Sequence, residues 1–153
     1  MAKQTEVEKF RKLCRREFRF LENEFDFVVR KLPINEIINQ YQVQYNNETT
    51  FVAVVGVNWG TGINVRIGRV EPEAWETYED YDLEDLIKIC CADLSLIGPD
   101  GFGTSNDQAF QLKHYANALK KCADDVLRGE FAIFPKLHEA IELRAKQFSK
   151  GEA

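Results

Sequence analysis

The sequence predicts an α+β domain in which an N-terminal helix, a four-stranded antiparallel sheet and three C-terminal helices pack together. Three observations predict this class. Apolar residues recur at three- and four-residue steps near both ends of the chain, which is typical of helices with one buried face. Between these regions apolar and polar residues alternate, which is typical of strands. Short turns rich in Asn and Gly separate the alternating runs, so neighbouring strands are expected to pair as an antiparallel meander.

Four helices are expected. The first covers residues 5–23, and its buried face consists of Val7, Phe10, Leu13, Cys14, Phe18 and Leu21. The second covers residues 83–96 and stops before Gly98 and Pro99, and the third covers residues 107–128 and ends at Gly129. The last helix begins at Pro135, a position where the missing N–H group of proline is harmless.

Four strands are expected over residues 25–31, 37–45, 50–57 and 63–68. In the second strand, glutamines alternate with Tyr41, Val43 and Tyr45, which predicts one wet face and one apolar face. The third strand is apolar on both faces, which is typical of a strand at the centre of a sheet. Helices with one apolar face must cover something, so we expect the three C-terminal helices to pack on this sheet.

The bulk composition fits one domain over residues 1–153, with frayed ends at about 1–4 and 149–153. The formal net charge is −5, which argues against a general nucleic-acid-binding protein. We find no apolar run long enough to span a membrane and no apolar region of a signal peptide in the first ten residues. The four cysteines form no C-x-x-C motif. We therefore expect a cytoplasmic protein without a metal or cofactor.

The segment from Glu71 to Asp85 is the most unusual surface feature. It contains eight Asp or Glu residues and no Lys or Arg, and aromatic residues are interleaved with the acids. Exposed rings among carboxylates would bind a basic protein, because the rings supply desolvated contacts and the charges steer the encounter. The predicted partner-binding residues are Trp59, Trp75, Tyr78, Glu79, Asp80, Tyr81 and Asp82. The structural alternative is that the acids stabilise the N-terminus of the following helix, with Asp82 as its N-cap.

A glycine-rich loop before the third helix is a possible anion-binding loop, through Gly101, Gly103, Thr104 and Ser105. It does not match the G-x-G-x-x-G pattern, and no lysine follows at the spacing of a phosphate-binding P-loop. The alternative interpretation is a simple helix–helix connection. The two histidines, His114 and His138, fall on different predicted helices, and no serine lies in a G-x-S-x-G motif. We therefore assign no catalytic residue and expect no enzymatic activity.

The order of motifs resembles a known group of proteins. The quoted segments are FRFLENEFDF, QYQVQYNNET, TTFVAVVGV, INVRIG, YDLEDLI and LKKCADDVLRGEFAIF, which together span about residues 10–134. This series is similar to small bacterial proteins that look like immunity proteins of polymorphic toxin systems. The resemblance implies a non-enzymatic inhibitor that binds one toxin, and it carries over no site residue because the motifs are structural.

Two other functions remain open at this point. A small-ligand-binding domain or an enzyme would use the 101–105 loop with Arg66 or His114 near a deep pocket. An adaptor or secretion chaperone would be a dimer, and three consecutive C-terminal helices fit that plan poorly. The leading hypothesis is an immunity-type protein that binds a basic protein partner, binds neither nucleic acid nor membrane, and is a monomer or homodimer.

Overall fold

The computed structural model describes residues 2–30, 41–57, 62–71, 80–91, 93 and 108–152. The helices are α1 (Ala2–Glu17), α2 (Arg19–Glu24), α3 (Leu83–Cys90), α4 (Gln108–Cys122), α5 (Asp124–Leu127) and α6 (Phe134–Glu152). The strands are β1 (Val28–Arg30), β2 (Gln42–Asn46), β3 (Thr50–Val57), β4 (Gly62–Arg69) and β5 (Tyr81–Asp82). The predicted α+β class is confirmed.

The strands form one antiparallel sheet in the order β1-β2-β3-β4-β5, so the predicted meander is confirmed and β3 is its central strand. The prediction of four strands is wrong. The fifth strand is a two-residue segment in which Tyr81 pairs with Ile67 and Asp82 pairs with Arg66. A strand this short carries too little alternation to stand out within an acidic segment.

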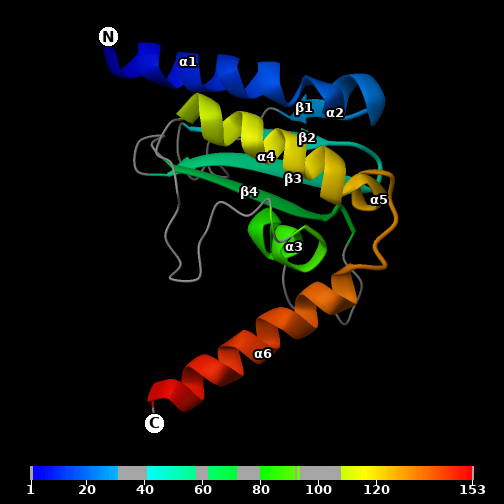
Figure 1. Cartoon of the computed structure of the whole chain (residues 1–153). Coiled ribbons are helices and arrows are strands. Elements are labelled where there is room, and N and C mark those ends of the chain that lie inside the picture. Colours follow the sequence, from blue (N-terminus) through cyan, green and yellow to red (C-terminus); the bar gives the residue numbers. More distant parts are fainter. Residues whose placement is uncertain are drawn as a thin grey trace.

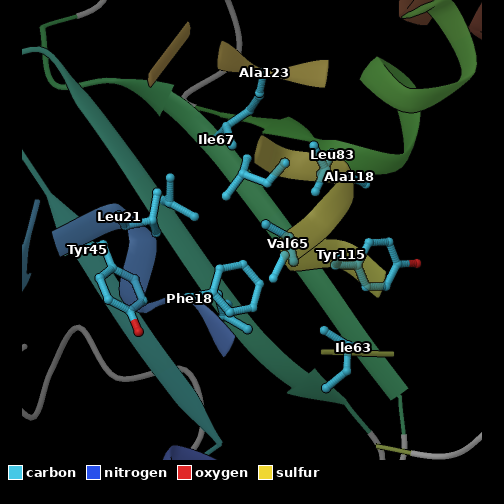
Figure 2. Packing of buried hydrophobic residues seen from close by; sticks show 14 of the residues in the cluster. Phe18, Leu21, Tyr45, Ile63, Val65, Ile67, Leu83, Tyr115, Ala118 and Ala123 are labelled. Carbon is cyan, nitrogen blue, oxygen red and sulfur yellow. The ribbon is translucent and has the colours of Figure 1, made fainter. Parts of the chain in front are cut away.

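The buried face of the sheet carries the side chains that alternate inward from each strand. Val43 and Tyr45 of β2, Val52 and Val54 of β3, and Val65 and Ile67 of β4 are all 5% exposed or less. They pack against the predicted apolar face of the first helix, where Phe10, Cys14, Phe18 and Leu21 are 0% exposed. Figure 2 shows this layer, with Phe18 and Leu21 beside Tyr45 and with Tyr115 and Ala118 of α4 near Val65.

The helices lie in a layer over this apolar face (Figure 1). Helices α1 and α4 lie side by side over the sheet, and α3 packs against both α4 and β4. Helix α6 differs from the expectation, because it packs along α3 and touches the sheet edge through Phe134, whose ring lies 4.7 Å from the ring of Tyr81. An ion pair of 2.7 Å between Arg144 and Asp85 also joins α6 to α3. The exposed residues 143–147 extend away from the layer (Figure 1).

Several helix boundaries differ from the predicted ones. The first predicted helix is split at Phe18, whose φ and ψ are −99° and 15°, and the third is split at Ala123, at −111° and 19°. Both residues are fully buried, so packing fixes these breaks without any proline or glycine. Helix α3 ends at Cys90 instead of residue 96. The predicted glycine C-cap is confirmed, since Gly129 has a φ of +88°.

Candidate functional site

The face of the sheet opposite the core is polar, and we call it the polar sheet face. Alternation and register place on it Val28 and Arg30 of β1, Gln42, Gln44 and Asn46 of β2, Phe51, Ala53 and Val55 of β3, Asn64 and Arg66 of β4, and Asp82 of β5. The predicted wet face of the second strand is confirmed for Gln42 and Gln44, which are half-buried. The structure describes no helix on this side of the sheet.

Apolar and polar residues have separate places on this face. Phe51, Ala53 and Val55 form a row along the central strand, because every second residue of β3 points this way. Gln42 and Gln44 line one side of the row, and Asn64 and Arg66 line the other. A central apolar row with polar neighbours resembles a protein–protein interface, which has a dry centre and a polar rim.

One corner of the face is acidic, and we call Asn64, Arg66, Asp80 and Asp82 the acidic corner. Arg66 donates from Nη2 and Nε to Oδ1 of Asp80, at 2.6 and 3.0 Å. Its Nη1 lies 3.6 Å from Oδ2 of Asp82, which also accepts a hydrogen bond of 2.9 Å from Asn64. Two carboxylates thus share one guanidinium, so the three charged groups leave one negative charge uncompensated. Each of these charged side chains is about one-third exposed.

Asp82 has a second role at the start of α3. Its Oδ1 accepts a 2.9 Å hydrogen bond from the backbone N–H of Glu84, which confirms the predicted N-cap. The structural and surface interpretations of Asp82 are therefore compatible, because one carboxylate oxygen caps the helix and the other faces Asn64 and Arg66. The helix fixes the position of the acidic corner.

Tyr81 contradicts the expectation of an exposed aromatic anchor. Its side chain is 1% exposed and packs against Phe134. The reason is strand alternation, which turns Tyr81 toward the core beside Ile67 and turns Asp82 outward beside Arg66. Four other predicted partner-binding residues, Trp59, Trp75, Tyr78 and Glu79, lie outside the residues that the structure describes. The same holds for the predicted anion loop of Gly101, Gly103, Thr104 and Ser105.

The sequence analysis missed a buried carboxylate next to this corner. Glu84 is 3% exposed, and Tyr115 of α4 hydrogen-bonds to it. Burial, followed by the charge of Glu84 and this hydrogen bond, raises the pKa of Tyr115, so the phenol stays protonated and acts as the donor. Glu84 lies in the first turn of α3, where the helix dipole stabilises a negative charge. This contact ties α3 to α4 behind the acidic corner.

The residues proposed for a ligand-binding alternative do not share a described hollow. Arg66 is engaged by two carboxylates, which weakens it as a receptor for an anion. His114 stacks on Phe110 at 6.2 Å between ring centroids and belongs to a different element. Two open surface hollows of about 680 and 620 Å³ lie elsewhere, one along α1 and α2 and the other beside the β2–β3 turn. Within the described residues no group of His, Cys, Asp and Glu side chains is arranged to hold a metal ion.

No family model matches the chain, and no curated protein or solved structure is detectably similar to it. The chemistry of the polar sheet face is therefore the basis for a functional assignment. Among the described helices, none has both the length and the apolar content that crossing a membrane requires.

Proposed function

We propose that this chain is a non-enzymatic protein-binding domain, an immunity-type inhibitor of a bacterial toxin, and that it acts in the cytoplasm. The observation that supports the proposal is the polar sheet face with its acidic corner, on a side of the sheet where the structure describes no helix. The four cysteines are free thiols, which suits a reducing compartment.

Charge indicates the kind of partner. The segment from Glu71 to Asp85 has eight acidic residues and no basic one, and its described part leads directly into the acidic corner. Arg66 neutralises only one of the two carboxylates that it contacts, so the corner itself adds negative charge. A basic protein surface, such as that of a nuclease toxin, is complementary to this charge and would associate faster because of it.

The apolar row gives such a complex its dry centre. Phe51 and Val55 are half-buried on the central strand, and Ala53 between them is 7% exposed. Trp75 and Tyr78, which precede the corner in sequence, remain the proposed aromatic anchors, and Trp59 is a third. Tyr81 is removed from the set because it is buried. Asp80 and Asp82 stay in it as part of the acidic corner.

Charge changes on the two sides of the sheet test the proposal. The double variant Gln44→Lys/Glu71→Lys changes the polar sheet face and an exposed residue of the acidic segment, and the control Glu8→Lys changes an exposed position of α1, on the helix side of the sheet. The tagged full chain and both variants would be used as baits for source-cell lysate, followed by mass spectrometry. We expect the wild type and Glu8→Lys to retain the same basic protein and Gln44→Lys/Glu71→Lys to lose it.

A captured protein must also be a toxin that the chain neutralises. Expression of the captured protein should arrest growth, and co-expression of the wild-type chain should restore growth while the double variant Gln44→Lys/Glu71→Lys does not. Equal capture and equal rescue by all variants would remove the polar sheet face as the docking site. A captured protein whose activity the chain leaves unchanged would count against the immunity function itself.

A further inference from the structure

Three of the four cysteines gather at one place in the fold. Cys90 is the last residue of α3, Cys91 follows it as the C-cap, and Cys122 is the last residue of α4. Helices α3 and α4 pack against each other, and the Cys122 thiol has those of Cys91 and Cys90 as neighbours. Cys14 is separate, because it is buried in the core of α1 beside Tyr45. The cluster is invisible in the sequence, where residues 92–121 separate its two parts.

Two thiols of the cluster are neighbours. The Cys122 side chain hydrogen-bonds to that of Cys91, and both side chains are half-exposed. Cys90 is exposed and lies near Lys136 of α6 and Asp125 of α5. A small reagent in solution can therefore reach the pair without opening the core.

The surroundings of Cys122 favour its protonated thiol. Cys122 is the last residue of α4, where the helix dipole disfavours a thiolate. Burial, followed by the hydrogen bond to Cys91, raises the pKa of Cys122 to about 12. Cys122 thus keeps its proton and donates to Cys91. Because Cys122 holds its proton, Cys91 is the sulfur that attacks first.

We propose that Cys91 and Cys122 are a modification site that forms a reversible disulfide by exchange with a low-molecular-weight disulfide such as oxidised glutathione. The Cys91 thiolate attacks one glutathione sulfur, the glutathione S–S bond breaks, and the released thiolate takes up a proton. Cys122 then attacks the mixed disulfide at the sulfur of Cys91, and the second glutathione leaves with the proton of Cys122. The two cysteines are oxidised, one glutathione disulfide becomes two thiols, and excess thiol reverses the reaction.

The disulfide would lock the ends of α3 and α4 together and close a loop of chain that includes residues 92–121. Closing a loop of this size restricts the unfolded chain more than the folded one. Oxidation is therefore expected to stabilise the fold, with a rise in the midpoint of thermal unfolding of roughly 5–10 °C. This consequence is independent of any partner of the polar sheet face.

Intact mass and peptide mapping of the purified full chain test the site. The chain would be incubated with oxidised glutathione at mildly alkaline pH, and the remaining thiols blocked with an alkylating reagent. Before alkylation, we expect the wild type and Cys90→Ser each to be lighter by two hydrogen atoms than the same chain in its reduced form. The peptide map should place the cross-link between Cys91 and Cys122. Cys91→Ser and Cys122→Ser should form no internal disulfide, and a dithiol reductant should reverse both the cross-link and the rise in melting temperature.

The mapping on the wild type decides the proposal even if a variant folds poorly. A cross-link between Cys90 and Cys91, a stable glutathione adduct at Cys90 without a cross-link, or four alkylated cysteines after prolonged incubation would each overturn it. A mapped Cys91–Cys122 disulfide with an unchanged melting temperature would keep the modification site but refute the expected locking of α3 to α4.

Discussion

The hydroxyl of Thr50 donates a buried hydrogen bond of 2.8 Å to the backbone carbonyl of Val126. Thr50 opens the central strand, and Val126 belongs to the short helix α5, so this bond fastens the β2–β3 turn to the helical layer. Asn47 strengthens the junction, because its Nδ2 donates to the carbonyls of Phe25 and Leu127 at 3.1 and 3.3 Å. The turn that connects two strands is thus held by backbone acceptors from α5 and from the end of α2.

The first prediction concerns this junction. Thr50→Val keeps the shape of the side chain but leaves the buried carbonyl of Val126 without its donor, so we expect a loss of about 1–3 kcal/mol in the free energy of unfolding, measured by urea denaturation. Thr49→Val is the comparison at the neighbouring residue, since Thr49 is exposed and its hydroxyl lies 3.1 Å from that of Thr50 and 3.4 Å from Oδ1 of Asn47. The control should lose less than about 1 kcal/mol. Equal losses in both variants would mean that the buried bond contributes little.

The second prediction concerns the glycine that follows α5. A Cβ at Gly129 would lie 2.9 Å from Oγ1 of Thr49, and the φ of +88° is unfavourable for any L side chain. We expect Gly129→Ala to reduce the free energy of unfolding by roughly 1–3 kcal/mol. Adding Thr49→Ala removes Oγ1 and should recover the steric part of this loss but not the backbone part. A double variant no more stable than Gly129→Ala alone would show that backbone strain, not the contact, dominates.

The sequence predicted the parts of the fold that have strong periodicity. The strand over residues 50–57 matches β3 at both ends, and the predicted apolar face of the first helix is the face that is buried. The breaks at Phe18 and Ala123 could not be predicted, because neither residue is a helix breaker and tertiary packing imposes the turn. The strand β5 was predictable in part, since Tyr81 and Leu83 alternate with Asp80 and Asp82, but helix-capping signals at the same residues obscure this alternation.

The candidate site was predictable only in its charge. The run of acids was visible in the sequence, and so was the capping role of Asp82. The pairing of Asp82 with Arg66 was not visible in the sequence, because the two residues become neighbours only through the register of β4 and β5. The contact between Cys91 and Cys122 depends in the same way on how two helices pack, which no local pattern encodes.

The third prediction concerns the strength of the acidic corner. Arg66 and Asp80 are close but one-third exposed, so water screens them and side-chain entropy opposes their pairing. A double-mutant cycle with Arg66→Met and Asp80→Asn should give a coupling free energy of about 0.5–1 kcal/mol, which decreases in concentrated salt. The more exposed pair of Lys120 and Glu24, at 3.1 Å, is the control and should couple more weakly. A coupling above about 2 kcal/mol would indicate a drier corner than the exposures imply.

The fourth prediction concerns the pH dependence of stability. Burial raises the pKa of Cys14 from 9.0 to about 12, so between these values the folded protein binds more protons at this thiol than the unfolded chain does. The free energy of unfolding should therefore fall as the pH rises above about 9, by at most about 1.4 kcal/mol per pH unit from this group. Urea denaturation at pH 8 to 10.5 measures this slope, and Cys14→Ala should flatten it.

The slope is the quantity to compare for Cys14→Ala, since the small cavity that this change leaves in the core lowers stability at every pH. Some slope should persist, because burial also raises the pKa of Tyr45, which lies beside Cys14, and that of Cys122. Cys90→Ala replaces an exposed thiol and serves as the control, and it should flatten the slope less than Cys14→Ala does. If the free energies of unfolding of Cys14→Ala and wild type fall in parallel between pH 9 and 10.5, Cys14 is not a source of the alkaline instability. Its thiol would then be less buried in solution than the packing of α1 on the sheet implies.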